Sequence, residues 1–396
     1  MPDINAVRDM LPGVHDTTYL NTGTCGPLPT TSYDAMLAEL QSDLTKARIS
    51  SNHFPTLIAS RGEVRSAVAA AIGADPAEIA VTASTTDGMM QTVVGYRWQP
   101  NDELLITNIE HPGGLIPSFL AKRRNNIRYR VVDLGLGGGE PAGIVRRFEE
   151  AITPRTRMIV LSHVSYTTGA KLPLKEIVAM AHAHDVLVVA DAAQSYGALH
   201  LDMHDLGVDA YACSGQKWMC GPDGTGALYV RADRVGDFEQ AFVSGGMQRD
   251  SMDYLGGSVS PALGAARFDT AGRNISLMVG QITSTRWITE ELGNDWVGER
   301  IEHISQHTHD RLSELPNVEV VTPKEAMGGL IAFNVVGIDG PDLSARLASE
   351  HNVTIRFVTK YINNPDAARV SLGFFNTEDD VDKFIVGVQA VQKTLA

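Results

Sequence analysis

Two polar residues near the middle of the chain have the types and surroundings of a catalytic pair. Asp191 follows the apolar run 188–190, so its carboxylate comes at the carboxyl end of a predicted strand, where open α/β sheets bind ligands. Lys217 lies in the run 214–218 between small residues, and the glycine-rich run 221–226 follows it. An amine in such a turn can be reached by the carbonyl group of a cofactor, while the carboxylate can pair with a protonated ring nitrogen.

These are the functional groups that pyridoxal 5′-phosphate (PLP) requires. The cofactor forms a Schiff base with a lysine, and an aspartate keeps its pyridine nitrogen protonated so that the ring acts as an electron sink. Each residue alone has a simpler explanation, because an aspartate after a strand is often a turn former or helix cap and a lone loop lysine is usually solvated. Together, each at its own strand end, Asp191 and Lys217 predict a PLP site.

A run of hydroxyl residues offers a place for the phosphate. Residues 82–88 follow a predicted strand and open a predicted helix. Amides and hydroxyls at a helix N-terminus suit a phosphate, although serine and threonine also favour this position as plain helix caps. The sequence alone leaves both interpretations open.

These motifs resemble the class V aminotransferase family of fold-type I PLP enzymes, which includes cysteine desulfurases and cyst(e)ine C–S lyases. The resemblance runs from Tyr19 to Glu378 and so covers nearly the whole chain. It implies that Lys217 is the Schiff-base lysine, that Asp191 pairs with the pyridine nitrogen and that His111 stacks on the ring. It also implies cofactor contacts from Thr85, Thr86 and Ser214 to the phosphate, from Gln216 to a phosphate oxygen and from Gln194 to the phenolic oxygen.

The resemblance extends to an amino acid substrate. Arg369 resembles the arginine that binds the substrate α-carboxylate through its forked guanidinium, although a surface salt bridge is the simpler interpretation of an isolated arginine. Tyr166 stands where many relatives place an amide over the cofactor. We therefore predict that the substrate is bound by Arg369, Asn21, Tyr166 and Arg356.

The chain departs from the desulfurases at one decisive place. Those enzymes carry a nucleophilic cysteine on a loop shortly before the substrate arginine, whereas residues 355–361 here contain none. The run 217–222 looks most like the C–S lyase branch. We therefore expect β-elimination from a cysteine S-conjugate or cystine, giving a thiol or persulfide, pyruvate and ammonia.

Other activities stay open on the same scaffold. The alternatives are an aminotransferase, an epimerase or a decarboxylation-coupled oxidative deaminase. A cysteine desulfurase is less favoured, and a non-catalytic binding protein is least favoured because Lys217 and Asp191 are both intact.

The elements that must position these residues form an α/β pattern. Short apolar runs alternate with helical stretches up to about residue 230, which predicts a mostly parallel, doubly wound sheet. The resemblance implies a PLP-binding large domain over 19–265 with a seven-stranded sheet, and a smaller α+β domain formed by 1–18 and 266–396. We predict strands at 104–107, 129–132, 158–162, 187–190, 227–230, 318–321, 329–336 and 353–357, and helices at 143–151, 173–184, 274–292, 295–315 and 377–395.

Composition limits the partners of the protein. The 396 residues carry a formal net charge of −14, which disfavours binding to nucleic acid or an anionic membrane. The three cysteines form an odd set that fits a reducing compartment, and the first 20 residues contain no apolar run typical of a signal peptide. We expect a soluble, cytoplasmic protein, and the resemblance implies a homodimer with active sites at the interface. The histidines at 303, 307 and 309 fit an ordinary amphipathic helix, so we expect no metal site.

Overall fold

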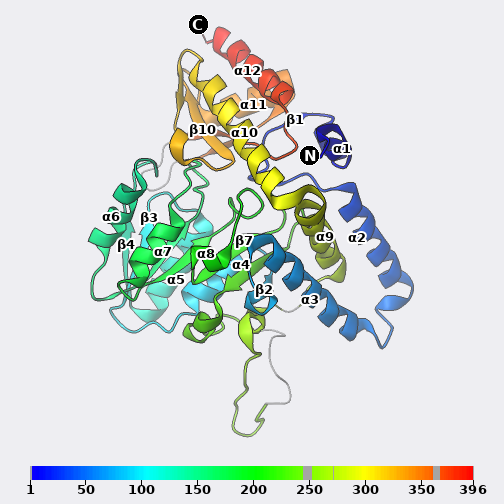
Figure 1. Ribbon diagram of the computed structural model, residues 1–396, viewed down its shortest axis with the longest axis vertical. Helices are drawn as coiled ribbons and strands as arrows, with labels where there is room; N and C mark the ends of the chain where they lie inside the picture. Colours follow the sequence, from blue (N-terminus) through cyan, green and yellow to red (C-terminus); the bar gives the residue numbers. More distant parts are fainter. Residues whose placement is uncertain (1, 244–251, 271, 360–365, 396) are drawn as a thin grey trace.

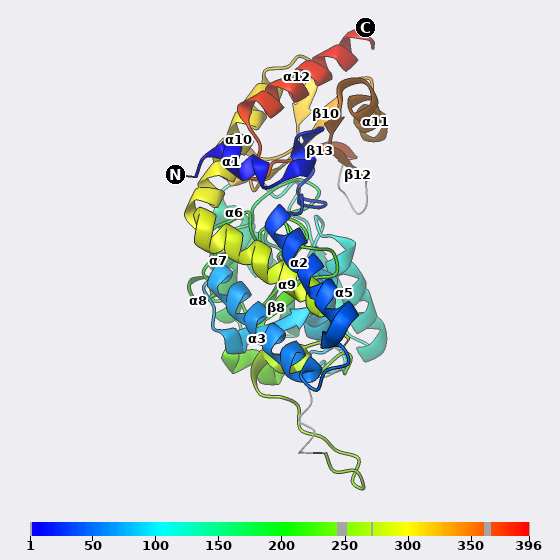
Figure 2. The ribbon, with the colours of Figure 1, turned by 90° about the vertical axis from the view of Figure 1, so that its right-hand side faces the viewer.

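The computed structural model describes residues 2–243, 252–270, 272–359 and 366–395. Two units make up the molecule, a larger one built on a seven-stranded sheet and a smaller one built on a four-stranded sheet (Figures 1 and 2). Helix α10 runs from the larger unit into the smaller one, which holds the C-terminus (Figure 1). Among the described residues, no helix combines the length and apolar character needed to span a bilayer.

The seven-stranded sheet confirms the predicted fold class. Its order is β2-β8-β7-β6-β5-β3-β4, and β8 alone among these strands runs antiparallel to its neighbours. Most of its strands are buried along their whole length, as expected of a sheet covered on both faces. The strands are β2 (Ile79–Thr82), β3 (Glu103–Thr107), β4 (Arg128–Val132), β5 (Thr156–Ser162), β6 (Leu187–Asp191), β7 (Ala210–Ser214) and β8 (Gly226–Val230).

Two hydrophobic clusters cover the faces of this sheet and are completed by helices. The helices predicted at 143–151 and 173–184 are confirmed as α6 and α7, within a few residues at each end. The helices of this part are α2 (Thr30–Ser42), α3 (His53–Ile72), α4 (Thr85–Met89), α5 (Pro112–Asn125), α6 (Pro141–Ala151), α7 (Leu174–His182), α8 (Met203–Leu206) and α9 (Ile275–Arg286), with π-helical turns over Asp43–Ala47, Met90–Val94 and Trp287–Gly293.

The smaller unit is an antiparallel sheet covered by three helices. The strand order is β12-β13-β10-β9, and side chains of the sheet and the helices share one core that includes Phe333 and Phe384. The elements are α10 (Asn294–Ser313), β9 (Val318–Val320), β10 (Leu330–Val335), α11 (Gly340–His351), β12 (Arg356–Val358), β13 (Ala367–Ser371) and α12 (Glu378–Lys393).

Two predicted elements differ from the structure. The strand expected at 353–357 is divided, because β11 (Val353–Thr354) pairs with β1 (Thr18–Tyr19) whereas β12 pairs with β13. Ile355 is buried in the core where the chain changes partner. The helix expected over 274–292 is α-helical only to Arg286 and continues as a π-helical turn.

The N-terminal segment lies against the smaller unit. Helix α1 (Ile4–Asp9) is tied to α12 by an ion pair of 2.8 Å between Arg8 and Asp380, and β1 pairs with β11. Helix α9, in contrast, packs against α2 and α3. The exact division of the chain at 265/266 stays a prediction.

Candidate active site

The carboxyl ends of the central strands surround a cavity of about 310 Å³. Asp191 is the last residue of β6, and Lys217 lies in the turn after β7. Because β5, β6 and β7 are parallel, these ends meet at the same edge of the sheet. The cavity is lined by Gly23, Thr24, His111, Tyr166, Gln194, Lys217, Arg356, Phe357, Val358, Thr359 and Arg369.

Lys217 is held in its turn by the backbone. The Cys220 N–H donates to the Lys217 carbonyl at 3.0 Å, and the Gly26 N–H donates to the Gln216 carbonyl at 2.7 Å. Burial lowers the pKa of Lys217 to about 8, because the charged amine is poorly solvated there. The positive charge of Arg369 lowers the pKa further, and the negative charge of Asp191 raises it only in part. About one tenth of the amine is therefore uncharged at pH 7, far more than for an ordinary lysine, and able to act as a nucleophile or base.

Buried polar atoms without partners mark the place where a cofactor fits. Asp191 Oδ1 accepts the Ala193 N–H at 2.9 Å, whereas Oδ2 has no hydrogen-bond partner among the described residues. The same holds, within the described part of the chain, for Thr85 Oγ1, Ser214 Oγ and Gln216 Oε1. Buried polar atoms normally have partners. A pyridinium N–H beside Asp191 and a phosphate beside the two hydroxyls would supply them, so these residues fit PLP.

The phosphate side of this site lies at the start of helix α4. The cap residue Ser84 accepts the Asp87 N–H at 3.2 Å, so the helix is capped by the residue before Thr85. Thr86 is exposed, and its hydroxyl lies close to Gly113 at the start of α5. The positions of Thr85 and Thr86 at the start of α4 are compatible with the predicted phosphate contacts, which stay predictions.

His111 is the cap of helix α5 and borders the cavity. Its Nδ1 accepts the Gly113 N–H at 2.9 Å, which leaves the ring proton on Nε2 in the neutral form. Burial lowers the pKa of His111 and so favours this neutral form. The ring of Tyr166 meets it edge to face, with 4.8 Å between centroids and an interplanar angle of 90°. Tyr166 therefore fixes the orientation of the ring predicted to stack on the cofactor.

Gln194 is oriented by two hydrogen bonds. Its Nε2 donates to the Gly23 carbonyl at 2.9 Å, and its Oε1 accepts the Trp218 indole N–H at 3.0 Å. The second N–H of the amide stays available to a cofactor oxygen, and this contact stays a prediction. Trp218 was not predicted as a site residue, although a large aromatic residue directly after the lysine is a usable signal.

Arg369 is buried and pre-oriented for a carboxylate. Its Nη1 donates to the Tyr166 carbonyl at 3.0 Å and its Nη2 donates to Thr24 Oγ1 at 3.1 Å. Thr24 in turn donates to Asn21 Oδ1 at 2.8 Å. Asn21 thus orients Thr24 and is not among the described residues that line the cavity. Gly23 and Thr24 do line it, although they were not predicted as site residues.

A second arginine stands beside the first. Arg356 on β12 is the register partner of Arg369 on β13, and its guanidinium carbon lies 5.9 Å from the centre of the Phe357 ring. Together with Lys217, three basic side chains border the cavity, and its described lining contains no aspartate or glutamate. The cavity therefore favours a substrate with negatively charged groups.

The segment that carries the cysteine in desulfurases also borders the cavity. Phe357, Val358 and Thr359 line it, and its described lining includes no cysteine. Residues 360–361 of the predicted loop lie outside the described residues. Cys25 lies nearby in the N-terminal segment, but burial and the neighbouring Asp223 raise the pKa of its thiol, which donates to Asp223 Oδ1 at 3.6 Å.

A buried glutamate lies directly behind this edge of the sheet. Glu110 precedes His111 and is completely inaccessible to solvent. Its two oxygens accept hydrogen bonds from Thr107 Oγ1 at 2.5 Å and Ser162 Oγ at 2.6 Å. Burial raises the pKa of Glu110 to about 7. This role could not be predicted, because nothing in the sequence shows that the side chain turns inward.

Comparison with known families assigns the chain. The family model described as aminotransferase class-V matches residues 19–384. The chain belongs to this family. The predicted resemblance and fold are therefore confirmed.

Members of the class V family with different reactions are similar to this chain over most of its length. A probable cysteine desulfurase of Methanothermobacter thermautotrophicus is 27% identical over 95% of this chain and 94% of its own. The isopenicillin N epimerase of Streptomyces clavuligerus is 27% identical over 94% of each chain. Family membership alone thus leaves the reaction undecided.

Solved structures of the cystine C–S lyase C-DES have the same fold. The complex of C-DES with its product cysteine persulfide superposes with a TM-score of 0.87 at 28% identity, covering 95% of this chain and 98% of C-DES. A C-DES mutant with glycine covalently linked to the PLP cofactor gives a TM-score of 0.88 at 27% identity, covering 98% of both chains. The cofactor predicted here is thus the one carried by a class V structural relative.

Proposed function

We propose that this class V protein is a PLP-dependent lyase that cleaves the C–S bond of a cysteine S-conjugate or of cystine by β-elimination. Its cofactor is pyridoxal phosphate. The observation that carries the proposal is a cavity that combines Lys217 and Arg369 with no cysteine among its described lining residues. A lyase needs no protein thiol to accept sulfur, whereas a desulfurase does. Similarity to the cystine C–S lyase C-DES supports the same conclusion.

Different residues of the site would contact different parts of the cofactor. Lys217 would hold it covalently, Asp191 would pair with its ring nitrogen, and Thr85, Thr86 and Ser214 would contact its phosphate. When bound, pyridoxal phosphate supplies an electron sink conjugated with the substrate Cα.

Proton transfer at Cα falls to Lys217. Arg369, whose Nη1 and Nη2 donate to the Tyr166 carbonyl and to Thr24 Oγ1, would bind the α-carboxylate and so fix the substrate in one orientation. The Lys217 amine, released when the substrate amine takes its place on the cofactor, would then remove the Cα proton. The Cβ–S bond breaks with its electron pair on sulfur, which leaves as a thiolate or persulfide. Hydrolysis of the remaining three-carbon fragment gives pyruvate and ammonia.

The second arginine narrows the substrate class. Arg356 lies across the strand pair from Arg369, so one guanidinium is available for the α-carboxylate and the other for an anionic group on the sulfur substituent. With no acidic side chain among the described lining residues, a second carboxylate meets attraction only. We therefore propose S-substituted cysteines that carry a distal carboxylate, a class that includes cystine.

Product analysis tests this proposal directly. The holoenzyme is incubated with L-cystine, S-methyl-L-cysteine and L-cysteine, and thiol or persulfide, pyruvate and carbon dioxide are quantified. Equal amounts of sulfur product and pyruvate are expected from cystine, with none from Lys217→Ala. Alanine in place of pyruvate would indicate desulfuration, and carbon dioxide without a sulfur product would contradict the lyase proposal.

Epimerisation is the second candidate, because isopenicillin N epimerase matches this chain as completely as the desulfurase does. An epimerase uses the same proton removal at Cα but returns the proton to the opposite face. Exchange of the Cα hydrogen with deuterated water and loss of optical activity, with no release of sulfur or pyruvate, would favour this function over the lyase.

A further inference from the structure

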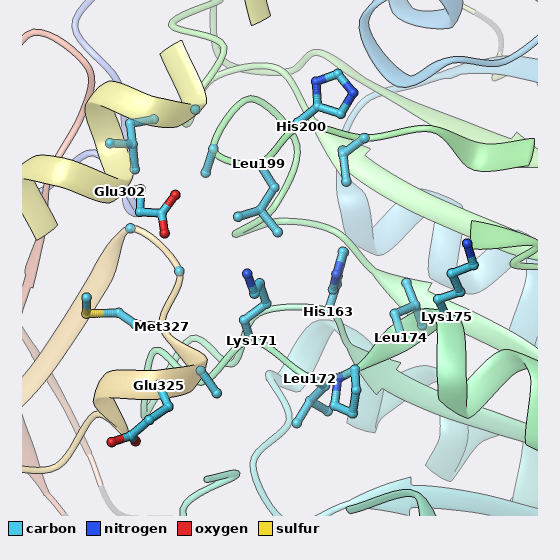
Figure 3. Close-up of a pocket in the computed structure, with 18 of the residues that line it drawn as sticks. His163, Lys171, Leu172, Leu174, Lys175, Leu199, His200, Glu302, Glu325 and Met327 are labelled. Carbon is cyan, nitrogen blue, oxygen red and sulfur yellow. The ribbon is translucent and has the colours of Figure 1, made fainter. Parts of the chain in front are cut away.

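A second and larger cavity, of about 660 Å³, lies where the two units of the molecule meet. Its walls come from the segment 171–176 before and within α7, from 198–201, from α10 and from 324–329 (Figure 3). It shares no described lining residue with the cavity around Lys217. The two walls are joined by backbone hydrogen bonds from the Lys171 N–H to the Ala326 carbonyl at 2.7 Å and from the Gly328 N–H to the Gly169 carbonyl at 3.0 Å.

The inner part of this cavity is apolar. Leu172, Leu201 and Ile301 are buried side chains of its wall, and Leu199 and Met327 also face it (Figure 3). Volumes of this order are typical of small-molecule sites, in which an apolar surface binds the body of the ligand and a few polar groups orient it.

One polar side chain is built into the wall. His163 follows β5, is 6% exposed and lines the cavity. Its Nδ1 is hydrogen-bonded to the Tyr211 hydroxyl at 3.0 Å, and none of the described residues is hydrogen-bonded to its Nε2. Burial lowers the pKa of His163 to about 3, so the ring is a neutral hydrogen-bonding group at physiological pH. It can bind a polar ligand atom without adding charge.

A lysine and a glutamate face the opening from opposite walls of the cavity. Lys171 lines the cavity and forms no ion pair with any described residue, whereas Lys175 and Lys324 are neutralised by Asp205 and Asp310. On the opposite side α10 contributes the carboxylate of Glu302. Figure 3 shows the charged ends of Lys171 and Glu302 turned toward the same opening, with Glu325 directed away from it.

The balance of charge excludes a simple anion site. The described lining contains the five carboxylates Glu176, Asp295, Glu299, Glu302 and Glu325 but only three lysines. A ligand that carried negative charge alone would be attracted by Lys171 and repelled by the more numerous carboxylates. A ligand with both a carboxylate and an ammonium group is complementary to the two sides together.

We propose that this cavity is a second ligand site, for a zwitterionic amino acid with an apolar side chain. The carboxylate of the ligand pairs with Lys171, its ammonium group pairs with Glu302, and its side chain packs on the leucine and isoleucine surface. His163 Nε2 provides a neutral hydrogen bond at the wall. The site is separate from the proposed lyase site and does not depend on the reaction catalysed there.

Isothermal titration of the holoenzyme tests the proposal with L-leucine, L-methionine and L-phenylalanine as probes. Binding of at least one probe is expected, and Lys171→Met and Glu302→Gln should each weaken it by about tenfold or more, the effect of losing one charge-assisted contact. Lys175→Met and Glu325→Gln are matched controls that remove the same charges at neighbouring positions and should leave the affinity nearly unchanged. Replacing L-leucine by 4-methylpentanoate, which lacks the ammonium group, should also weaken binding.

Binding in the catalytic cavity is distinguished by Arg369→Ala. A probe that binds the second site keeps its affinity in this variant. The proposal is overturned if none of the three probes binds, if Lys171→Met and Glu302→Gln leave their affinity unchanged, or if Arg369→Ala alone abolishes the binding. None of these outcomes bears on the lyase proposal, which product analysis tests separately.

Discussion

At the scale of single residues, the candidate active site combines basic side chains at the cavity with a buried glutamate behind it. Lys217, Arg356 and Arg369 border the cavity. Glu110 lies beneath it, and its two oxygens accept hydrogen bonds from two hydroxyl groups. We propose that the basic groups bind the cofactor or the substrate, whereas the glutamate belongs to the buried structure next to His111. These roles lead to different experiments.

Glu110 should make stability depend on pH. Burial raises its folded-state pKa from 4.5 to about 7, so its contribution to stability is fully present below pH 4.5 and is lost as the pH rises to 7. The loss corresponds to roughly 3 kcal/mol as an upper bound. Glu110→Gln keeps one oxygen that can accept from a hydroxyl, offers an N–H to the other hydroxyl, and does not ionise. Urea unfolding at pH 5 and pH 8 should show wild type losing more stability than the variant, and equal losses would contradict this role.

Substitution of the two arginines should have different effects on KM. Arg369→Ala should raise KM for both L-cystine and S-methyl-L-cysteine by roughly 30-fold, because it removes a buried partner of the α-carboxylate worth about 2 kcal/mol or more. Arg356→Ala should raise KM by about fivefold, and for L-cystine only, since an exposed ion pair contributes about 1 kcal/mol or less. Steady-state kinetics on both substrates measure this difference. An equal effect of Arg356→Ala on the two substrates would show that Arg356 does not recognise the distal carboxylate.

At the scale of elements, the turn that carries Lys217 depends on the N-terminal segment packed against it. Gly26 lies so close to this turn that an added Cβ would be 2.1 Å from the Lys217 carbonyl oxygen and 2.9 Å from Cys220 Sγ. The segment between β1 and α2 therefore forms one wall of the site and also fixes the position of the lysine.

Gly26→Ala should destabilise the protein by roughly 1–3 kcal/mol, the usual effect of overpacking, and should weaken cofactor retention. Gly13→Ala is the matched control, because an added Cβ there meets no atom within 4 Å. Urea unfolding and the visible absorbance of the bound cofactor measure the two effects. A Gly26→Ala protein as stable as the Gly13→Ala protein would contradict the packing described here.

The sequence was most informative where one residue type or one pattern decides the structure. Apolar runs flanked by turns located β5, β6 and β8, and the lysine and aspartate motifs located the cofactor site. The sequence analysis assigned no residue range to strand β7 (Ala210–Ser214), because its run of mostly small residues lacks the branched apolar side chains typical of a buried strand. The strand pairs with both of its neighbours and is completely buried. Contacts such as that of Thr24 with Arg369, which are 345 positions apart, come only from tertiary folding.

At the scale of the whole molecule, exposed apolar side chains support the predicted homodimer. Leu37, Leu40 and Leu44 lie exposed along α2 and the turn after it, and Phe54 and Ile58 lie exposed on the neighbouring α3. Several large apolar side chains exposed on two consecutive helices are typical of an interface with another chain. The predicted cytoplasmic location stays a prediction.

Light scattering of the holoenzyme should give twice the chain mass of 42.7 kDa. Leu40→Asp combined with Leu44→Asp should shift the mass toward that of one chain, because the charges would have to be buried in the interface. Val386 is also exposed but lies on α12 of the smaller unit. Val386→Asp is therefore the control, and this variant should stay dimeric. A wild-type protein of single-chain mass would contradict the prediction.

The most direct test of the account concerns Lys217. The holoenzyme is reduced with borohydride, digested and analysed by mass spectrometry, with Lys217→Ala treated in parallel. We predict that the wild type absorbs visible light before reduction and that the reduced cofactor is found on the peptide containing Lys217, while the variant shows neither. A colourless wild-type protein after incubation with PLP, or cofactor attached to a different lysine, would contradict the assignment of Lys217 and the function built on it.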